Sequence, residues 1–256
     1  MTRRARPSAA GRQQGYTLLE VAIALAVVGL LGAGLYGAQQ ALYSHGSQGQ
    51  AQAEAEAERA RQAVLAYALR MQRLPCPDTT GNGWASHADG QCSQASGWLP
   101  YETLGLAGAA APGANGRRLA YAALRVPGGP DLFRPSAGAA PVDYSPGGEA
   151  ALYETLRRAG QMPYDGAALR LATARQGVAD PCAGATQVNP AFVVIAPATP
   201  AAGGALPVFS AAHAALARGA ALCAIAPAGG RANQNSDAVA AVGTAELLGW
   251  LAARAH

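Results

Sequence analysis

Lysine is absent from this chain, so all 19 of its Lys and Arg residues are arginine. The absence excludes a Walker A phosphate loop, a Schiff-base lysine and a lysine general base. The sequence also contains no GxSxG, HExxH or SxxK, which are motifs of serine hydrolases, zinc proteases and penicillin-recognising enzymes. We therefore expect no catalytic residue, and an enzyme is the least favoured class of function.

Aromatic residues are scarce at 6% of the chain, whereas Gly and Pro are frequent, with 32 and 17 residues. This composition predicts a modest core with many turns, and a head domain of α+β structure with long loops over residues 75–256. The candidate strands are Leu119–Val126, Ala168–Thr173, Phe192–Ala196 and Ala221–Ala226. The candidate short helices are Glu149–Ala159, Ser210–Arg218 and Thr244–Arg254.

Acidic residues are missing from the first 15 positions, which contain four arginines. Without these four, 15 arginines face 15 acidic residues, so the formal charge of +4 belongs to the N-terminus. A basic N-terminus before an apolar run is a membrane-topology signal, because positive flanks stay in the cytoplasm. The remaining arginines are scattered and form no basic face, so nucleic acid is not an expected partner.

Proline is absent between Pro7 and Pro75, which allows one long helix from about Tyr16 to Arg73. Residues 18–38 form a 21-residue stretch whose only charged residue is Glu20, long enough to span a bilayer. Residues 50–73 are strong helix formers with an apolar stripe on one side. The stripe consists of Ala57, Ala60, Val64, Tyr67, Met71 and Leu74.

Glu20 is the most informative residue, because a carboxylate inside an apolar span is costly and usually functional. It ends the segment Gly15-Tyr16-Thr17-Leu18-Leu19-Glu20, which follows the basic N-terminus. This arrangement resembles the signal of type IV pilins and pseudopilins. The resemblance implies that prepilin peptidase cuts after Gly15, methylates Tyr16 and leaves Glu20 five residues into the mature chain. Tyr16 stands where most members of the family have Phe.

The resemblance also implies a fold and a division of the chain. The fold is α+β and pilin-like, with a long N-terminal helix packed on a small, irregular antiparallel-sheet domain with disulfides. The expected parts are a leader (1–15), a transmembrane and filament-core helix (16–43), an amphipathic continuation (44–74) and a periplasmic head (75–256). In the filament, Glu20 of one subunit is expected to neutralise the Tyr16 amine of its neighbour.

The leading interpretation is a structural subunit, a minor pilin or pseudopilin of a type IV pilus or type II secretion-like filament. Its expected partners are prepilin peptidase, the inner membrane and other pilin subunits. The head is expected first in the periplasm and then in a periplasmic or surface filament. Two alternatives stay open, an adhesive, substrate-binding or DNA-binding minor pilin, and a membrane-anchored periplasmic protein of another function. The sequence does not decide which filament machine uses the subunit, including a competence filament.

The four cysteines are Cys76, Cys92, Cys182 and Cys223. An even number outside the cytoplasm suggests two disulfides, for which three pairings are possible. We favour Cys76–Cys92 with Cys182–Cys223, because neighbours in sequence close small loops. A metal site is not expected, because the sequence contains no CxxC motif and no cluster of His with Cys. No cofactor is expected either.

The segment Asp78–Gly83 is similar to the acidic first half of a calcium loop. Thr80 replaces an expected acid, and Asp89 stands where the loop needs Glu. A turn stabilised by Asp and Asn side chains explains the same residues, and we prefer it.

The tryptophans Trp84 and Trp98 are expected in the core rather than at a ligand site. Trp98 with Leu99 and Leu104 is expected to pack its loop against the long helix.

Overall fold

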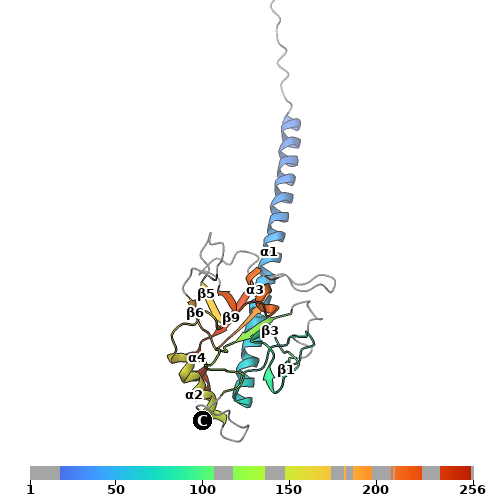
Figure 1. The fold of residues 1–256 in the computed structure, drawn as a ribbon. Helices are drawn as coiled ribbons and strands as arrows, with labels where there is room; N and C mark the ends of the chain where they lie inside the picture. Colours follow the sequence, from blue (N-terminus) through green and yellow to red (C-terminus); the bar gives the residue numbers. More distant parts are fainter. Residues whose placement is uncertain are drawn as a thin grey trace, which may run out of the picture. The chain divides into compact units, whose positions relative to one another are not determined.

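The structure is a computed structural model that describes residues 18–106, 118–135, 148–173, 182, 187–197, 209, 211–226 and 237–254. The chain divides into two units, residues 1–45 and 46–256. The helices are α1 (Leu18–Met71), α2 (Gly148–Gln161), α3 (Ala211–Ala217) and α4 (Thr244–Ala252) (Figure 1). The strands are β1 (His87–Ala88), β2 (Gln91–Cys92), β3 (Ser96–Trp98), β4 (Ala120–Ala123), β5 (Arg170–Thr173), β6 (Gln187–Val188), β7 (Phe192–Ala196), β8 (Cys223–Ala226) and β9 (Ala238–Val242).

Helix α1 is continuous from Leu18 to Met71, as the absence of proline predicts. It ends at Gln72, whose φ of 52° lies in the left-handed region, and the Gln72 side chain donates to the Leu69 carbonyl at 2.7 Å. A left-handed residue after the last turn is a common way for a helix to end. The expected end before Pro75 is therefore confirmed.

The second half of α1 buries one face against the head. The buried residues recur every three or four positions, as an amphipathic helix requires. They are Ala53, Ala57, Ala60, Val64, Leu65, Tyr67 and Ala68. Met71, which we expected in this stripe, is instead 47% exposed, because it lies at the last position of the helix.

The main sheet has four antiparallel strands in the order β3-β4-β7-β9. The interior strand β7 reads Phe-Val-Val-Ile-Ala and is buried along its whole length, which explains its unbroken apolar run. Phe192 and Val194 belong to the same hydrophobic cluster as the buried face of α1. Val193 and Ile195 belong to a second cluster with Leu216 of α3, because successive strand side chains point to opposite faces. The sheet therefore lies between α1 and α3.

A second sheet has three strands in the order β6-β5-β8. β5 pairs with β6 antiparallel, but it pairs with β8 in parallel, with Arg170 opposite Cys223. Among the described strands this is the one parallel pair, and the other pairs are antiparallel. A parallel pair needs a long crossover, and the chain between β5 and β8 includes β6, β7 and α3.

The expected α+β fold, with an N-terminal helix followed by antiparallel sheets and two disulfides, is confirmed. All of the candidate strands and short helices are present, with ends that differ by up to a few residues. α2 and α4 lie beside each other, near the C-terminus of the chain (Figure 1).

Tyr121 of β4 is fully buried between the sheet and α1, and its ring lies 6.4 Å from that of Phe192. Its hydroxyl has no hydrogen-bond partner among the residues that the structure describes. A buried hydroxyl without a partner costs free energy that the ring's burial must offset. Burial, and secondarily the neighbouring Tyr67, raise the pKa of Tyr121 well above its ordinary value.

The first prediction concerns this hydroxyl. Tyr121→Phe should leave the free energy of unfolding unchanged or raise it by up to about 1 kcal/mol, since it removes an unpaired polar atom. Tyr121→Ala should lower it by about 3–5 kcal/mol, because it removes the ring and leaves a cavity. Denaturant unfolding of the two variants measures both effects. A loss above about 1 kcal/mol in Tyr121→Phe would reveal a partner for the hydroxyl.

Comparison of the wild type with Tyr121→Phe also predicts how stability depends on pH. The unfolded chain loses the Tyr121 proton near pH ~10, whereas the folded chain keeps it. Stability from this residue is therefore complete below that pH and falls as the pH rises above it. The free energy of unfolding should fall more steeply above that pH in the wild type than in Tyr121→Phe.

Candidate functional site

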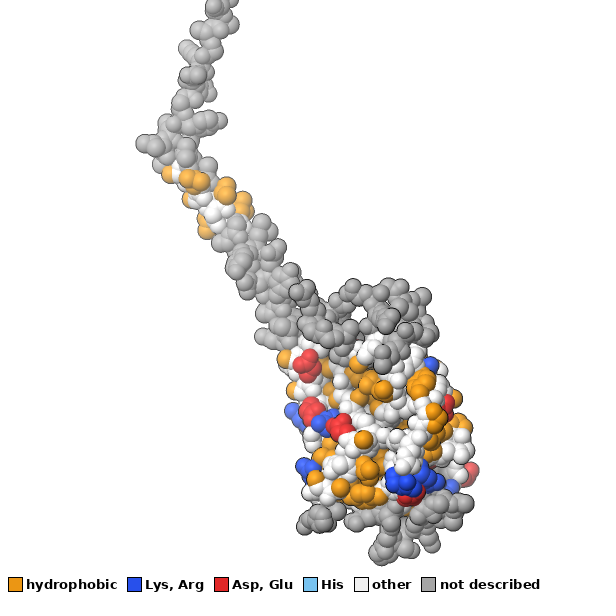
Figure 2. Space-filling model, turned by 90° about the vertical axis from the view of Figure 1, so that its left-hand side faces the viewer, with side chains coloured by type: hydrophobic (Ala, Val, Ile, Leu, Met, Phe, Trp, Pro, Cys, Tyr) orange, Lys and Arg blue, Asp and Glu red, His pale blue; other side chains and the backbone are white. Residues whose placement is uncertain are grey.

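The first part of α1 presents apolar side chains to its surroundings. Within residues 22–31, every residue whose exposure the structure describes is exposed, and the large ones are Ile23, Leu25, Val27, Val28, Leu30 and Leu31. Leu30 has 75% of its surface exposed (Figure 2 shows apolar side chains on this segment). A helix that is apolar on all sides requires apolar surroundings.

In the part of the chain that the structure describes, no helix combines the length and the hydropathy that a membrane span requires.

The residues predicted for processing lie at the start of this helix. Glu20 belongs to α1, near its first residue. Gly15 and Tyr16 lie outside the described residues, as does the side chain of Glu20. Their expected roles therefore stay predictions.

In the head, the loop after α1 is organised by the carboxylate of Asp78, which is fully buried. Its Oδ1 accepts hydrogen bonds from the Thr80 amide at 2.9 Å, the Thr80 hydroxyl at 3.1 Å and the Gly81 amide at 2.7 Å. Its Oδ2 accepts one from the Gly83 amide at 2.7 Å. Both carboxylate oxygens of Asp78 are therefore used in hydrogen bonds to the loop that follows it. These contacts fit the turn that we preferred to a calcium loop.

This loop is also fixed to β3. The amide of Asp78 donates to the Trp98 carbonyl, and the Trp98 amide donates back, both at 2.9 Å. Gly97 allows this close pairing, because a Cβ there would lie 2.8 Å from the Asp78 carbonyl oxygen. The chain is therefore fixed to β3 at Asp78, only a few residues after α1 ends.

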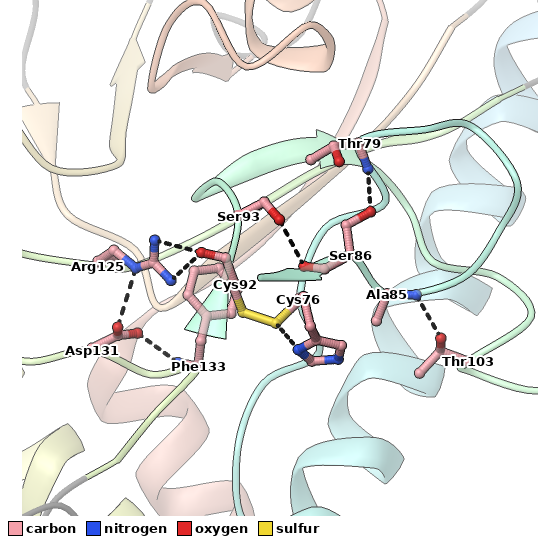
Figure 3. Close-up of a disulfide and its surroundings, with 11 residues drawn as sticks. Cys76, Thr79, Ala85, Ser86, Cys92, Ser93, Thr103, Arg125, Asp131 and Phe133 are labelled. Carbon is pink, nitrogen blue, oxygen red and sulfur yellow. Dashed lines mark hydrogen bonds and ion pairs between the residues drawn. A yellow bond between two sulfur atoms is a disulfide. The ribbon is translucent and has the colours of Figure 1, made fainter. Parts of the chain in front are cut away.

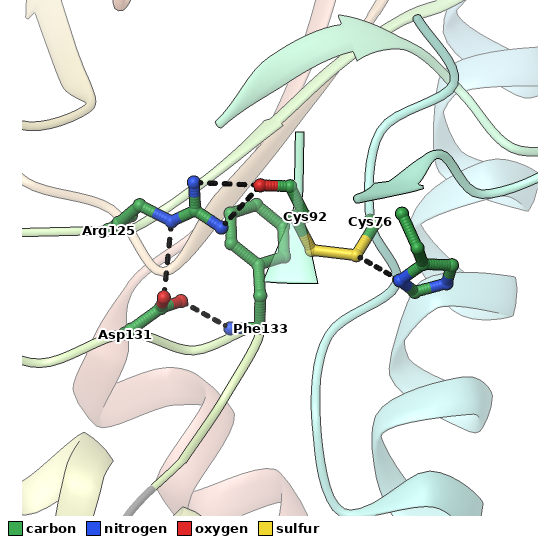
Figure 4. Close-up of polar contacts among 6 residues, drawn as sticks. Cys76, Cys92, Arg125, Asp131 and Phe133 are labelled. Carbon is green, nitrogen blue, oxygen red and sulfur yellow. Dashed lines mark hydrogen bonds and ion pairs between the residues drawn. A yellow bond between two sulfur atoms is a disulfide. The ribbon is translucent and has the colours of Figure 1, made fainter. Parts of the chain in front are cut away.

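The Cys76–Cys92 disulfide joins the end of α1 to the β1–β2 hairpin (Figure 3). The Arg125 guanidinium donates two hydrogen bonds of 3.1 Å to the Cys92 carbonyl and a third, also 3.1 Å, to Asp131 (Figure 4). It also lies 5.1 Å from the centre of the Phe133 ring, within range of a cation–π contact. Arg125 therefore ties the disulfide hairpin to the segment after β4.

His87 lies beside this disulfide, with its Nδ1 3.3 Å from the Cys76 sulfur. It stands directly opposite Cys92 in the hairpin, whose turn is Asp89-Gly90 with φ values of 51° and 74°. Burial, and secondarily the positive charge of Arg73, lower the pKa of His87. Sequence reasoning missed this neighbour, although Asp-Gly between two short strands is a strong hairpin signal that could have revealed it.

The second disulfide, Cys182–Cys223, anchors residue 182 to the first residue of β8. Both disulfides are the pairs that the sequence analysis favours. They span sequence separations of 16 and 41 residues, and the chain-entropy model assigns each a stabilisation of ~3–4 kcal/mol.

A buried His–Asp pair joins α3 to the strands. His213 Nδ1 lies 2.7 Å from Asp237 Oδ2, and both side chains are at most 4% exposed. The Ile225 amide donates to His213 Nε2 at 3.0 Å, so the ring proton must sit on Nδ1. In a hydrolase triad, Nε2 would instead face a nucleophile. With both ring nitrogens used inside the fold, the pair is structural rather than catalytic.

The expectation for the two tryptophans is wrong in part. Trp84 is 58% exposed, because the Asp78 loop directs it away from the core. Trp98 packs on the face of the sheet opposite α1, with its ring 6.1 Å from that of Phe209. Leu99 and Leu104 do join the cluster that contains α1.

Comparison with known families matches residues 11–36 to the prokaryotic N-terminal methylation motif. The chain carries the signal of type IV pilins and pseudopilins. This pilin-like motif implies processing by prepilin peptidase and is typical of membrane-anchored, extracytoplasmic proteins, which are generally structural rather than enzymatic. No curated protein and no solved structure matches the chain.

The second prediction separates the turn from a calcium loop. Asp78→Asn should lower the free energy of unfolding by about 2–3 kcal/mol, since its amide group cannot accept all four hydrogen bonds. Asp89→Asn is the matched control, because Asp89 is exposed and Asn tolerates its positive φ; its effect should stay within about 0.5 kcal/mol. Denaturant unfolding without and with Ca²⁺ checks both. A rise in stability with Ca²⁺ that Asp78→Asn abolishes would favour the calcium loop.

Proposed function

We propose that this pilin-like protein is a structural subunit, a minor pilin or pseudopilin of a type IV pilus or type II secretion-like filament. It is cleaved after Gly15, methylated at Tyr16 and assembled through Glu20 and α1. The observation that supports this proposal most directly is the methylation motif on a helix whose described residues from 22 to 31 are apolar and exposed. In this proposal, neighbouring subunit helices cover that surface in the filament, and lipid covers it beforehand.

The energetic argument starts from the exposed side chains. Burying a Val, Leu or Ile fully stabilises a protein by roughly 1.5–3 kcal/mol relative to leaving it in water. Six such residues of α1 are about half exposed or more. Gly29 lies among them, and apart from its chain neighbours and the nearby helix backbone, no atom of the described residues lies within 4 Å of the place where its Cβ would be. Together with Ala33 and Gly37 at four-residue spacing, it provides small residues where another helix can approach closely.

Glu20 gives this packing its register. Cleavage after Gly15 creates a positive amine at Tyr16, and a charge of either sign alone is costly among apolar helices. A carboxylate of a neighbouring subunit pairs with that amine only when the two helices are correctly staggered. Glu20 therefore favours one arrangement of subunits over others.

The chain is divided accordingly into a leader (1–15), a transmembrane and filament-core helix (16–43), an amphipathic continuation (44–74) and a head (75–256). We place the head in the periplasm, with the helix in the inner membrane before assembly. The two disulfides support this location, since disulfides persist in oxidising compartments.

A ligand-binding head receives less support, because the described residues of the two Arg-Arg pairs in the sequence, Arg118, Arg157 and Arg158, have partners within the protein. Arg157 and Arg158 both form ion pairs with Glu154. The Arg118 guanidinium lies 5.7 Å from the centre of the Trp98 ring. These residues therefore do not form a free basic patch.

The third prediction tests processing. The chain recovered from cells with prepilin peptidase should begin at N-methylated Tyr16, and the chain from cells without the enzyme should keep Gly15 and the residues before it. Gly15→Leu should prevent cleavage, because a bulky residue replaces the small one before the cut. Intact mass and N-terminal sequencing measure the outcome. A cut after the apolar run in all strains would contradict the proposal.

The fourth prediction tests assembly separately from cleavage. Glu20→Gln should still be cleaved, but its recovery in filaments should fall at least about tenfold, equivalent to the ~1.4 kcal/mol that one lost charge contact can supply. Glu54→Gln is the matched control, because Glu54 is an exposed carboxylate in the same helix and accepts a hydrogen bond from Gln50. Quantitative immunoblotting of the sheared filament fraction provides the measurement. Equal recovery of both variants would remove the proposed role of Glu20.

A further inference from the structure

Two cysteines and a histidine lie together where the segment after α1 meets the β1–β2 hairpin. The sulfurs of Cys76 and Cys92 and a ring nitrogen of His87 all lie within 4.8 Å of one another. The filament function proposed above does not use this cluster. It contains sulfur and imidazole donors, which are the ligands that zinc prefers in proteins.

Each of these donors lies close to a backbone contact that does not involve the disulfide bond. His87 and Cys92 are directly opposed in the β1–β2 hairpin, which places their side chains on the same face. Arg125 fixes the Cys92 backbone through the carbonyl oxygen. Cys76 lies two residues after Leu74, whose amide donates to the Leu132 carbonyl at 2.8 Å. Loss of the sulfur–sulfur bond therefore leaves three separate anchors around the cluster.

We propose that the dithiol form of the head binds one Zn²⁺ ion through Cys76, Cys92 and His87, with water as the fourth ligand. The disulfide form cannot bind it, because metal coordination needs thiolates. A dithiol reductant links the two states. It transfers two electrons and two protons to the sulfur–sulfur bond and becomes a disulfide itself. Zn²⁺ then displaces the two thiol protons. In the reverse direction, a partner disulfide takes two electrons from the thiolates and two protons from water and becomes a dithiol, so that the Cys76–Cys92 bond re-forms and the ion is released.

Access to the cluster comes from the histidine side. The two cysteines are 3% and 7% exposed, whereas His87 is exposed. An ion can therefore reach the imidazole first and the sulfurs second. A head that is not yet oxidised would in this way keep its first cysteine pair together and apart from Cys182 and Cys223.

The second cysteine pair is an internal control. In the described part of the chain, no histidine or carboxylate completes a three-ligand group with Cys182 and Cys223. A metal that merely prefers thiols should bind both pairs alike. A built site should bind only the first.

The test uses the full-length chain, reduced and freed of reductant without air, with Co²⁺ as the spectroscopic probe for Zn²⁺. Cys182→Ser/Cys223→Ser should show a thiolate-to-Co²⁺ absorption band that saturates at one ion per chain and is lost when Zn²⁺ is added. Cys76→Ser/Cys92→Ser should show none. His87→Gln should weaken Co²⁺ binding at least about tenfold, the lower range for loss of a group that supports a metal site, and His45→Gln should not. Equal bands from both double variants, or none from either, would overturn the proposal.

A second measurement decides the matter if the reduced variants lose their circular dichroism spectrum. The reduced wild-type chain is reoxidised with and without Zn²⁺, and alkylation followed by peptide mass spectrometry follows each disulfide. Zn²⁺ should slow closure of Cys76–Cys92 but not of Cys182–Cys223, and His87→Gln should remove the difference. Equal slowing of both pairs, or slowing of neither, would contradict a site at the first pair.

Discussion

The contact between the second half of α1 and the main sheet is the interaction on which the head depends. α1 contributes mostly alanines along the first part of this face and larger residues such as Val64, Leu65 and Tyr67 further on. The sheet contributes Tyr121, Phe192 and Val194 to the same cluster. Alanine carries little side-chain bulk or entropy, so the helix can approach the sheet closely at small conformational cost. A chain with few aromatics thereby obtains a continuous core.

The geometry after α1 follows from that contact. Once the helix is fixed on the sheet, the chain must turn back over it within a few residues of Met71. Leu74 bonds to the backbone at Leu132, Cys76 is joined to the hairpin, and Asp78 pairs with Trp98. Each anchor limits the freedom of the next, so the Asp78 loop pays little additional entropy to become ordered. Trp84 emerges from this fixed loop, which explains why a large aromatic lies exposed beside a well-packed core.

The sequence predicts those features that depend on local patterns or on length. The uninterrupted helix, the buried run of β7 and the pairing of neighbouring cysteines all belong to this group, and the structure contains each of them. The strand β9 was missed, because Ala-Val-Ala-Ala-Val has weak β propensity and owes its pairing to Phe192–Ala196 of β7. The parallel pair β5–β8 could not be inferred either, since it depends on how a long crossover returns.

Contacts between side chains that are far apart in the sequence were the least predictable feature of the structure. The sequence places 10 residues between Cys76 and His87, and no common metal motif has that spacing. The two meet because the Asp89-Gly90 turn folds β1 onto β2, which sets His87 opposite Cys92, the residue to which Cys76 is bonded. His213 and Asp237 likewise meet through packing of α3 on β8. In both cases the residue types were visible, but their roles depend on tertiary contacts.

The two halves of α1 differ in how their apolar side chains are distributed around the helix. In the second half, alternation of apolar and charged residues confines burial to one face, and the head supplies a complementary apolar surface. In residues 22–31 the apolar residues occupy every side, and the described exposure is high throughout. The head's own apolar residues already cover one another in its two main clusters. The filament and membrane environments proposed above are ones in which the exposed apolar side chains of residues 22–31 would be removed from water.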